Sequence, residues 1–244
     1  MGKIYVVGMG PGREAGMTEE AKEALAVSDV LIGYMVYIDL LRERYPEKEL
    51  LTTGMKQEVE RCRLCLEQAE SGKTVSLVCS GDAGVYGMAS LMLEVAEEAP
   101  EVEIEVVAGV TAALSGGALL GAPLGHDFCV VSLSDLLTPW DLIERRLRAA
   151  AEGDYVIVIY NPRSRSRADH LKTVCGILAE KLPSDRPCGL ARNIGRDGES
   201  AEVCTLEELK EKDADMFTTV FIGNSMSRVV NGRLVTPRGY RRNG

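Results

Sequence analysis

The sequence has few aromatic residues, no long apolar run and no excess of positive charge, and the last two shortages each exclude a class of protein. Aromatic residues make up 5% of the 244, with one tryptophan. No apolar stretch reaches the roughly 20 residues that cross a bilayer, and the N-terminus lacks the apolar region and cleavage site of a signal peptide. The formal net charge of −9 argues against a protein that mainly binds nucleic-acid phosphates. We therefore expect a cytoplasmic globular protein with neither a membrane nor a nucleic acid as its partner.

Patterns for metal binding and disulfides are also lacking. There are two histidines, His126 and His170, and seven cysteines, an odd number that predicts reduced thiols in a chain without a secretory signal. Cys62 and Cys65 have the spacing of zinc and redox sites, but a zinc site would need a second such pair. Their surroundings have a mid-helix pattern, which favours helix packing, and no metal site is predicted.

The charges that are present divide unevenly along the chain. Residues 1–126 carry 10 basic and 20 acidic groups, whereas residues 127–244 carry 18 basic and 17 acidic groups. Arg163 and Arg165 alternate with serines, and no acidic residue follows Asp215. We therefore expect an anionic ligand to bind the second half, while Arg241 and Arg242 are typical of a solvated tail.

Short β-branched runs alternate with longer helical patterns, which is typical of the βαβ units of an α/β fold. Thr18 begins one helix, Thr205 and Glu208 form a capping box for another, and Thr138 caps a third that ends near Gly153. Residues 55–70 form a long amphipathic helix. Nine strands are predicted, at residues 4–7, 30–33, 74–79, 104–107, 128–133, 155–160, 188–193, 202–205 and 219–222.

A run of small residues at 116–125 interrupts this alternation, and the charge balance changes at the same place. We therefore place a boundary near 122–126, with one α/β domain over residues 1–122 and a second over residues 123–244. Both sheets are expected to be mostly parallel. Because ligand sites favour domain interfaces and the carboxyl ends of strands, a ligand cleft is expected between the two domains.

Four turns rich in glycine or polar residues each follow a predicted strand. The first, at 8–12, begins like a dinucleotide fingerprint, but Arg13 replaces the third glycine, so NAD is not expected. The second carries Asp82, which could bind an amine or a ribose hydroxyl or could cap a helix beginning near Val85. The third, at 109–113, offers backbone groups and a hydroxyl. The fourth, at 160–167, has the alternating arginines, which suit carboxylates or phosphates.

Taken in order, these segments resemble the class III tetrapyrrole methyltransferases over nearly the whole chain. The glycine-rich opening, Ser80-Gly81-Asp82 and Thr111-Ala112 match motifs of the superfamily, although many relatives have proline where this chain has Ala83. More specific matches resemble the branch that methylates C-17 of precorrin-3B or cobalt-factor III and contracts the corrin ring. They are GHDF at 125–128, SLSDLLTPW at 132–140, YNPRSR at 160–165, ARNIGR at 191–196, FIGNS at 221–225 and TPRGY at 236–240.

The resemblance implies S-adenosyl-L-methionine as cofactor, a tetrapyrrole as substrate and a homodimer. Many of the cofactor contacts it implies would be made through the backbone. By position, the residues that match the cofactor site are Pro11, Gly81, Asp82, Val85, Thr111, Ala112, Asn161, Asn193 and Ile194.

The chemistry fits these residues, because methyl transfer from a sulfonium needs alignment and exclusion of water more than a strong acid or nucleophile. For the carboxylates of the macrocycle the local positive charge comes from Arg163, Arg165, Arg192 and Arg196. Ring contraction should need proton transfer, for which the candidates are His126, Asp127 and Asp135. For His126 the alternative is a linker histidine bonded to the backbone.

Two other functions remain open from the sequence. One is a sibling enzyme that methylates another tetrapyrrole carbon, and the other is a non-catalytic module that binds an adenosine ligand. A ribosomal RNA ribose, the substrate of some relatives, would favour a more basic surface.

Overall fold

The computed structural model describes residues 2–163 and 169–240, and it divides into two compact units, Met1–Thr111 and Ala112–Gly244. Contacts divide the chain ahead of the 122–126 segment expected from composition, because helix α5 (Ala112–Leu120) packs on the strands of the second unit. Within the described residues, no helix is long and apolar enough to cross a membrane.

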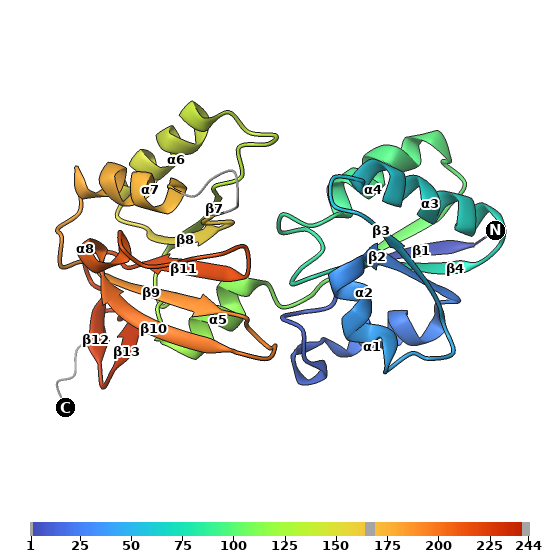
Figure 1. Ribbon diagram of the computed structural model, residues 1–244, viewed down its shortest axis with the longest axis horizontal. Helices are drawn as coiled ribbons and strands as arrows, with labels where there is room; N and C mark the ends of the chain where they lie inside the picture. Colours follow the sequence, from blue (N-terminus) through green and yellow to red (C-terminus); the bar gives the residue numbers. More distant parts are fainter. Residues whose placement is uncertain (1, 164–168, 241–244) are drawn as a thin grey trace. The chain divides into compact units, whose positions relative to one another are not determined.

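The first unit is built on a five-stranded sheet with every pair of neighbours parallel, in the order β3-β2-β4-β1-β5. Helices α3 and α4 cover one face and α1 and α2 the other, as Figure 1 shows. Both faces of the central strands are therefore buried, which explains their continuous apolar sequence. The strands are β1 (Lys3–Gly8), β2 (Val30–Tyr34), β3 (Glu49–Thr53), β4 (Thr74–Cys79) and β5 (Glu103–Val107), and the helices are α1 (Glu19–Val27), α2 (Met35–Arg42), α3 (Glu58–Glu70) and α4 (Ala89–Val95), with short 3-10 turns η1 (Glu14–Gly16) and η2 (Ala96–Glu98).

The second unit also has a five-stranded sheet, in the order β10-β9-β11-β8-β7, with α6 and α7 on one face and α5 on the other (Figure 1). A small sheet, β12-β13-β6, accompanies it. The remaining elements are β6 (Gly121–Ala122), β7 (Phe128–Ser132), α6 (Trp140–Glu152), β8 (Val156–Tyr160), α7 (His170–Ala179), β9 (Pro187–Arg192), β10 (Ser200–Thr205), α8 (Leu206–Leu209), β11 (Thr218–Ile222), β12 (Arg228–Val230) and β13 (Arg233–Val235).

The pairing in this second sheet differs from the parallel arrangement expected from the sequence. Only β7 and β8 pair in parallel, whereas β9 pairs antiparallel with β10 and β11, and β11 pairs antiparallel with β8. The seven residues between Arg192 and Ser200 are too few for a parallel crossover, which needs a dozen or so. Strands β7, β8 and β9 nevertheless run in the same direction, so their carboxyl ends share one edge of the sheet.

Most helix starts agree with the sequence. The Thr18 hydroxyl accepts a hydrogen bond from the Ala21 N–H at 3.1 Å, and the capping box of Thr205 and Glu208 is complete. Two starts were predicted too early. Helix α6 begins with Pro139 as its N-cap rather than Thr138. Helix α3 begins at Glu58 rather than near residue 55, because Lys56 has a positive φ of 65° that a helix cannot include.

Candidate functional site

Three loops meet at the carboxyl edge of the first sheet, after the neighbouring strands β4, β1 and β5. The loops after β1 and β4 are joined by two hydrogen bonds, from the Gly10 N–H to the Gly81 carbonyl (3.0 Å) and from the Gly81 N–H to the Gly10 carbonyl (2.8 Å). The chain leaves β1 toward β2 and leaves β4 toward β5, on opposite sides of the sheet. Open parallel sheets bind ligands at such a position, where the direction of the connections reverses.

Glycine is required where these loops touch. A Cβ on Gly109 would lie 2.2 Å from the Gly81 carbonyl oxygen and 2.3 Å from that of Gly8. A Cβ on Gly8 would lie 2.8 Å from the Gly109 nitrogen. Gly10 and Gly81 both adopt positive φ angles, of 69° and 68°. The loops can therefore approach each other only as bare backbone.

Asp82 holds two of the loops together. One carboxylate oxygen, Oδ1, accepts hydrogen bonds from the N–H groups of Gly84 (2.8 Å) and Val85 (3.1 Å). The other, Oδ2, accepts from the Gly109 N–H at 2.9 Å. Helix α4 does not begin until Ala89, so Asp82 caps a turn and links the loops after β4 and β5 instead of capping that helix.

The other first-unit residues matched to a cofactor site lie on these same loops. Pro11 and Val85 are half-buried, and Thr111 is the last residue of the first unit. The Thr18 hydroxyl, which sequence reasoning assigned only to a helix cap, also donates a hydrogen bond to the Ala108 carbonyl at 3.0 Å. The start of α1 is thereby tied to the loop after β5.

Asparagines directly follow two strands of the second unit, β8 and β9, and both have a positive φ, 53° for Asn161 and 49° for Asn193. The Asn161 side-chain amide donates to the Ser132 hydroxyl at 2.9 Å, which joins the loops after β8 and β7. Tyr160, at the end of β8, accepts from the Ala113 N–H in the first turn of α5 at 2.6 Å. No sequence motif singled out this tyrosine contact.

Ala112 and Ile194 belong to the packing of the same unit. Ile194 is buried, and its side chain lies 3.0 Å from the position of a Cβ on Gly116 of α5. Ala112, the first residue of α5, packs against the same hydrophobic cluster.

Three of the predicted substrate arginines meet around residues 213–217, the segment that leads into β11. Arg163 forms an ion pair with the Asp213 carboxylate. Arg192 donates to the Asp213 main-chain carbonyl at 2.6 Å, and the Arg196 guanidinium lies 5.3 Å from the centre of the Phe217 ring. We call Arg163, Arg192 and Arg196 the arginine cluster. It lies at the edge where β8 and β9 end. The fourth predicted arginine, Arg165, lies outside the described residues.

The three acid–base candidates lie at opposite ends of β7. His126 and Asp127 precede the strand, are exposed, and contact each other: the Asp127 N–H donates to His126 Nδ1 at 2.9 Å. Asp135 follows the strand, and its Oδ2 lies 3.9 Å from Nε2 of His170. The five residues of β7 span roughly 17 Å. A single reacting atom therefore cannot exchange protons both with the His126–Asp127 pair and with Asp135.

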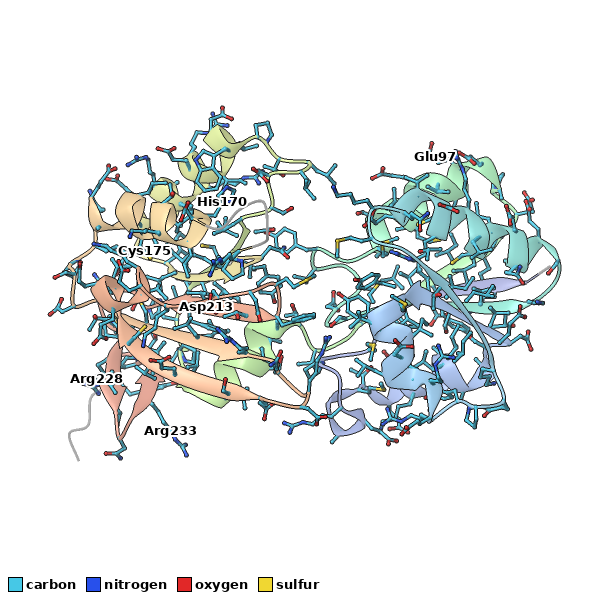
Figure 2. All side chains as sticks on the ribbon, viewed as in Figure 1. Glu97, His170, Cys175, Asp213, Arg228 and Arg233 are labelled. Carbon is cyan, nitrogen blue, oxygen red and sulfur yellow. The ribbon has the colours of Figure 1, made fainter. Side chains whose placement is uncertain are left out.

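His170 is a residue of this edge that the sequence reasoning did not assign to a site. Figure 2 shows it on α7. Its Nδ1 lies 3.4 Å from the Leu133 carbonyl, and its ring lies 4.5 Å from that of Trp140. A single histidine carries no recognisable motif, and only folding brings His170 next to Asp135, so the sequence alone did not indicate this pair.

The cysteines pack in the two cores. Cys62 and Cys65 lie within α3 and are buried, which confirms the expected role in helix packing. Burial raises the pKa of the Cys62 thiol to about 12, and it raises that of Cys79 to about 11. These thiols are therefore protonated at neutral pH, the state in which they are unreactive.

Comparison with known proteins identifies the family. Residues 3–210 match the model of the Tetrapyrrole (Corrin/Porphyrin) Methylases. The chain belongs to this family. The matched residues extend over both units of this tetrapyrrole methylase and include the three glycine loops and the arginine cluster.

Individual relatives cover nearly the whole methylase chain. A "Probable cobalt-factor III C(17)-methyltransferase" of Salmonella typhimurium is 45% identical over 238 residues, 97% of this chain and 99% of the relative. A "Precorrin-3B C(17)-methyltransferase" of Sinorhizobium sp is 41% identical, covering 98% and 97%. The crystal structure of the methyltransferase CobJ has a TM-score of 0.90 at 39% identity, covering 97% of this chain and 100% of that one. The two-unit α/β fold is therefore that of the tetrapyrrole methylases.

Proposed function

We propose that this tetrapyrrole methylase transfers a methyl group from S-adenosyl-L-methionine to C-17 of precorrin-3B or cobalt-factor III, with contraction of the corrin ring, in cobalamin biosynthesis. The proposal is carried by the full-length similarity to two relatives with C-17 names, at 45% and 41% identity. A relationship confined to the fold would leave the methylated carbon open, whereas these two matches cover 97% and 98% of the chain.

The three glycine loops of the first unit suit the cofactor. Gly8, Gly81 and Gly109 present main-chain groups without side chains, as close approach of a ligand to a backbone requires. Asp82 fixes the spacing of two loops through three hydrogen bonds. When bound, S-adenosyl-L-methionine supplies an electrophilic methyl group. The chain's part is to hold and orient it with Pro11, Gly81, Asp82, Val85 and Thr111. For Ala112, Asn161, Asn193 and Ile194 a cofactor role stays a prediction.

The arginine cluster suits a substrate with several carboxylates. Guanidinium groups bind carboxylates through paired hydrogen bonds, and this unit supplies them although the whole chain is acidic. Arg163, Arg192 and Arg196 are proposed to hold carboxylates at the rim of the macrocycle. Arg165 belongs to the same proposal by its sequence position.

For ring contraction, Asp135 is the stronger candidate of the three acid–base residues. It lies at the edge of the sheet where the arginine cluster lies, and His170 faces it. His126 and Asp127 lie at the other end of β7, and Asp127 is 82% exposed. We propose that Asp135 moves protons during contraction and that the other two do not.

Anaerobic incubation with S-adenosyl-L-methionine and each macrocycle in turn tests the reaction. Mass spectrometry should show one added methyl group on cobalt-factor III or precorrin-3B, and the macrocycle that reacts distinguishes the cobalt-containing route from the metal-free one. Methylation of neither, with cofactor binding intact by calorimetry, would leave a sibling enzyme or a non-catalytic binding module. Light scattering tests the proposed homodimer, which would have twice the 26.4 kDa mass of one chain.

A further inference from the structure

One arginine of the arginine cluster, Arg163, is bound to a carboxylate of the chain itself. Asp213 meets Arg163 through its side chain and Arg192 through its main-chain carbonyl. Figure 2 labels Asp213, which lies in the segment between α8 and β11. The two contacts are chemically independent, because only the one with Arg163 needs the carboxylate.

The Arg163–Asp213 ion pair is exposed on both sides. The Asp213 side chain is 75% exposed and that of Arg163 is 41% exposed. Because water screens an exposed pair and competes for its hydrogen bonds, such pairs shift equilibria only a few-fold. A carboxylate from another molecule can therefore replace Asp213 at little cost, and it would find Arg192 already held in place by the main chain.

We propose that Asp213 is an internal competitor for the substrate: its carboxylate occupies Arg163 in the free enzyme and leaves it when a carboxylate of the macrocycle binds. This inference rests on the proposed function, since it requires a substrate with carboxylates. The pair would weaken binding of the proper substrate slightly. It would not change binding of a macrocycle without a carboxylate at this position, because such a ligand leaves the Arg163–Asp213 pair intact. Asp213 would thus set the affinity of the enzyme for macrocycles that place a carboxylate on Arg163.

The decisive variant is Asp213→Asn, which removes the charge but keeps an oxygen that can accept from Arg163. Wild-type enzyme must first bind and methylate cobalt-factor III or precorrin-3B, and failure at that step would reject the proposed function and not the competitor role. For Asp213→Asn we expect KM and the equilibrium Kd for the macrocycle to fall about two- to five-fold, as loss of an exposed ion pair allows. The value of kcat should not change.

Glu211→Gln is the matched control. Glu211 lies two residues away, is 75% exposed, and pairs with Lys172 at 3.4 Å, so its substitution changes the net charge equally without releasing Arg163. Arg163→Gln gives the second test. In an Arg163→Gln background, Asp213→Asn should no longer lower the Kd for the macrocycle, because the guanidinium for which Asp213 competes is absent.

Three results would overturn the inference. The first is a Kd for Asp213→Asn equal to that of Glu211→Gln. The second is a raised Kd, which would mean that Asp213 positions Arg163 for the substrate. The third is a gain that persists in the Asp213→Asn, Arg163→Gln double variant. Because Asp213 is exposed, we expect all variants to unfold at the wild-type temperature, and circular dichroism checks this.

Discussion

A methyl group at Gly109 tests whether the three glycine loops form the cofactor site. In Gly109→Ala the new Cβ would lie 2.2 Å and 2.3 Å from two carbonyl oxygens, more than 1 Å inside the 3.4 Å at which ordinary contact begins. Both neighbours are main chain and cannot rotate away. The loops after β1 and β4 must therefore separate from the loop after β5, which also stretches the 2.9 Å bond from Gly109 to Asp82.

The expected magnitude follows from these contacts. Overpacking costs about 1–3 kcal/mol, and loss of a hydrogen bond to a carboxylate adds about 1.5–3 kcal/mol. We expect the first unit to lose about 2.5–6 kcal/mol of its free energy of unfolding. Binding of S-adenosyl-L-methionine should weaken more than tenfold at temperatures where the protein stays folded.

Gly176→Ala is the control for this substitution. Gly176 lies in α7, and a Cβ there meets nothing within 4 Å. Alanine in a helix interior should stabilise by up to about 1 kcal/mol, and cofactor binding should not change. Urea unfolding and titration calorimetry measure both quantities. If folded Gly109→Ala binds the cofactor as tightly as Gly176→Ala does, the assignment of the cofactor to these loops is wrong.

Three further predictions follow from the same contacts. Asp82→Asn leaves one acceptor oxygen for three N–H donors, so the free energy of unfolding measured in urea should fall by about 1–3 kcal/mol and cofactor affinity should also fall. The control Asp29→Asn should be nearly neutral, because Asp29 needs only one acceptor, for the Thr74 N–H. Equal losses in the two variants would contradict the role of Asp82 as a link between loops. Burial raises the pKa of Cys62 to about 12 and that of Cys79 to about 11, so the folded state keeps thiol protons that the unfolded state releases above pH about 8.5. The stability that these thiols contribute should be fully present below that pH and should fall as the pH rises toward 11. A urea midpoint that is equal at pH 7 and pH 10 would refute this. Asp135→Asn should slow ring contraction about 10²- to 10⁴-fold, as absorption spectra would show, while methylation measured by mass spectrometry changes little. His126→Gln should leave both steps unchanged. The reverse pattern would assign the proton transfer to His126.

Local sequence signals predicted most of the fold. All nine predicted strands are present, because most of them are β-branched runs bounded by turn residues. The two strands β12 and β13 were missed although Asn231-Gly232 between them, with positive φ at both residues, is a strong hairpin signal. Strand β3 carries no such run and owes its conformation to pairing with β2.

Features that depend on pairing between distant segments could not be predicted in this way. The direction of β11 relative to β8 and β9 is set by tertiary packing, although the short β9–β10 connection already indicated a hairpin. The glycine turns were recognised, but not that Gly8, Gly81 and Gly109 touch. Likewise, nothing in the sequence near Asp213 shows that Arg192 of β9 and Arg163 of the loop after β8 both reach it.

The position of the transferred methyl group tests the central claim most directly. Anaerobic incubation with carbon-13-labelled S-adenosyl-L-methionine and the macrocycle that reacts, followed by carbon NMR of the product, identifies the carbon that receives it. We predict one labelled methyl at C-17 of a contracted ring. Label at another carbon of the macrocycle would keep the tetrapyrrole methylase fold and cofactor but contradict the proposed reaction.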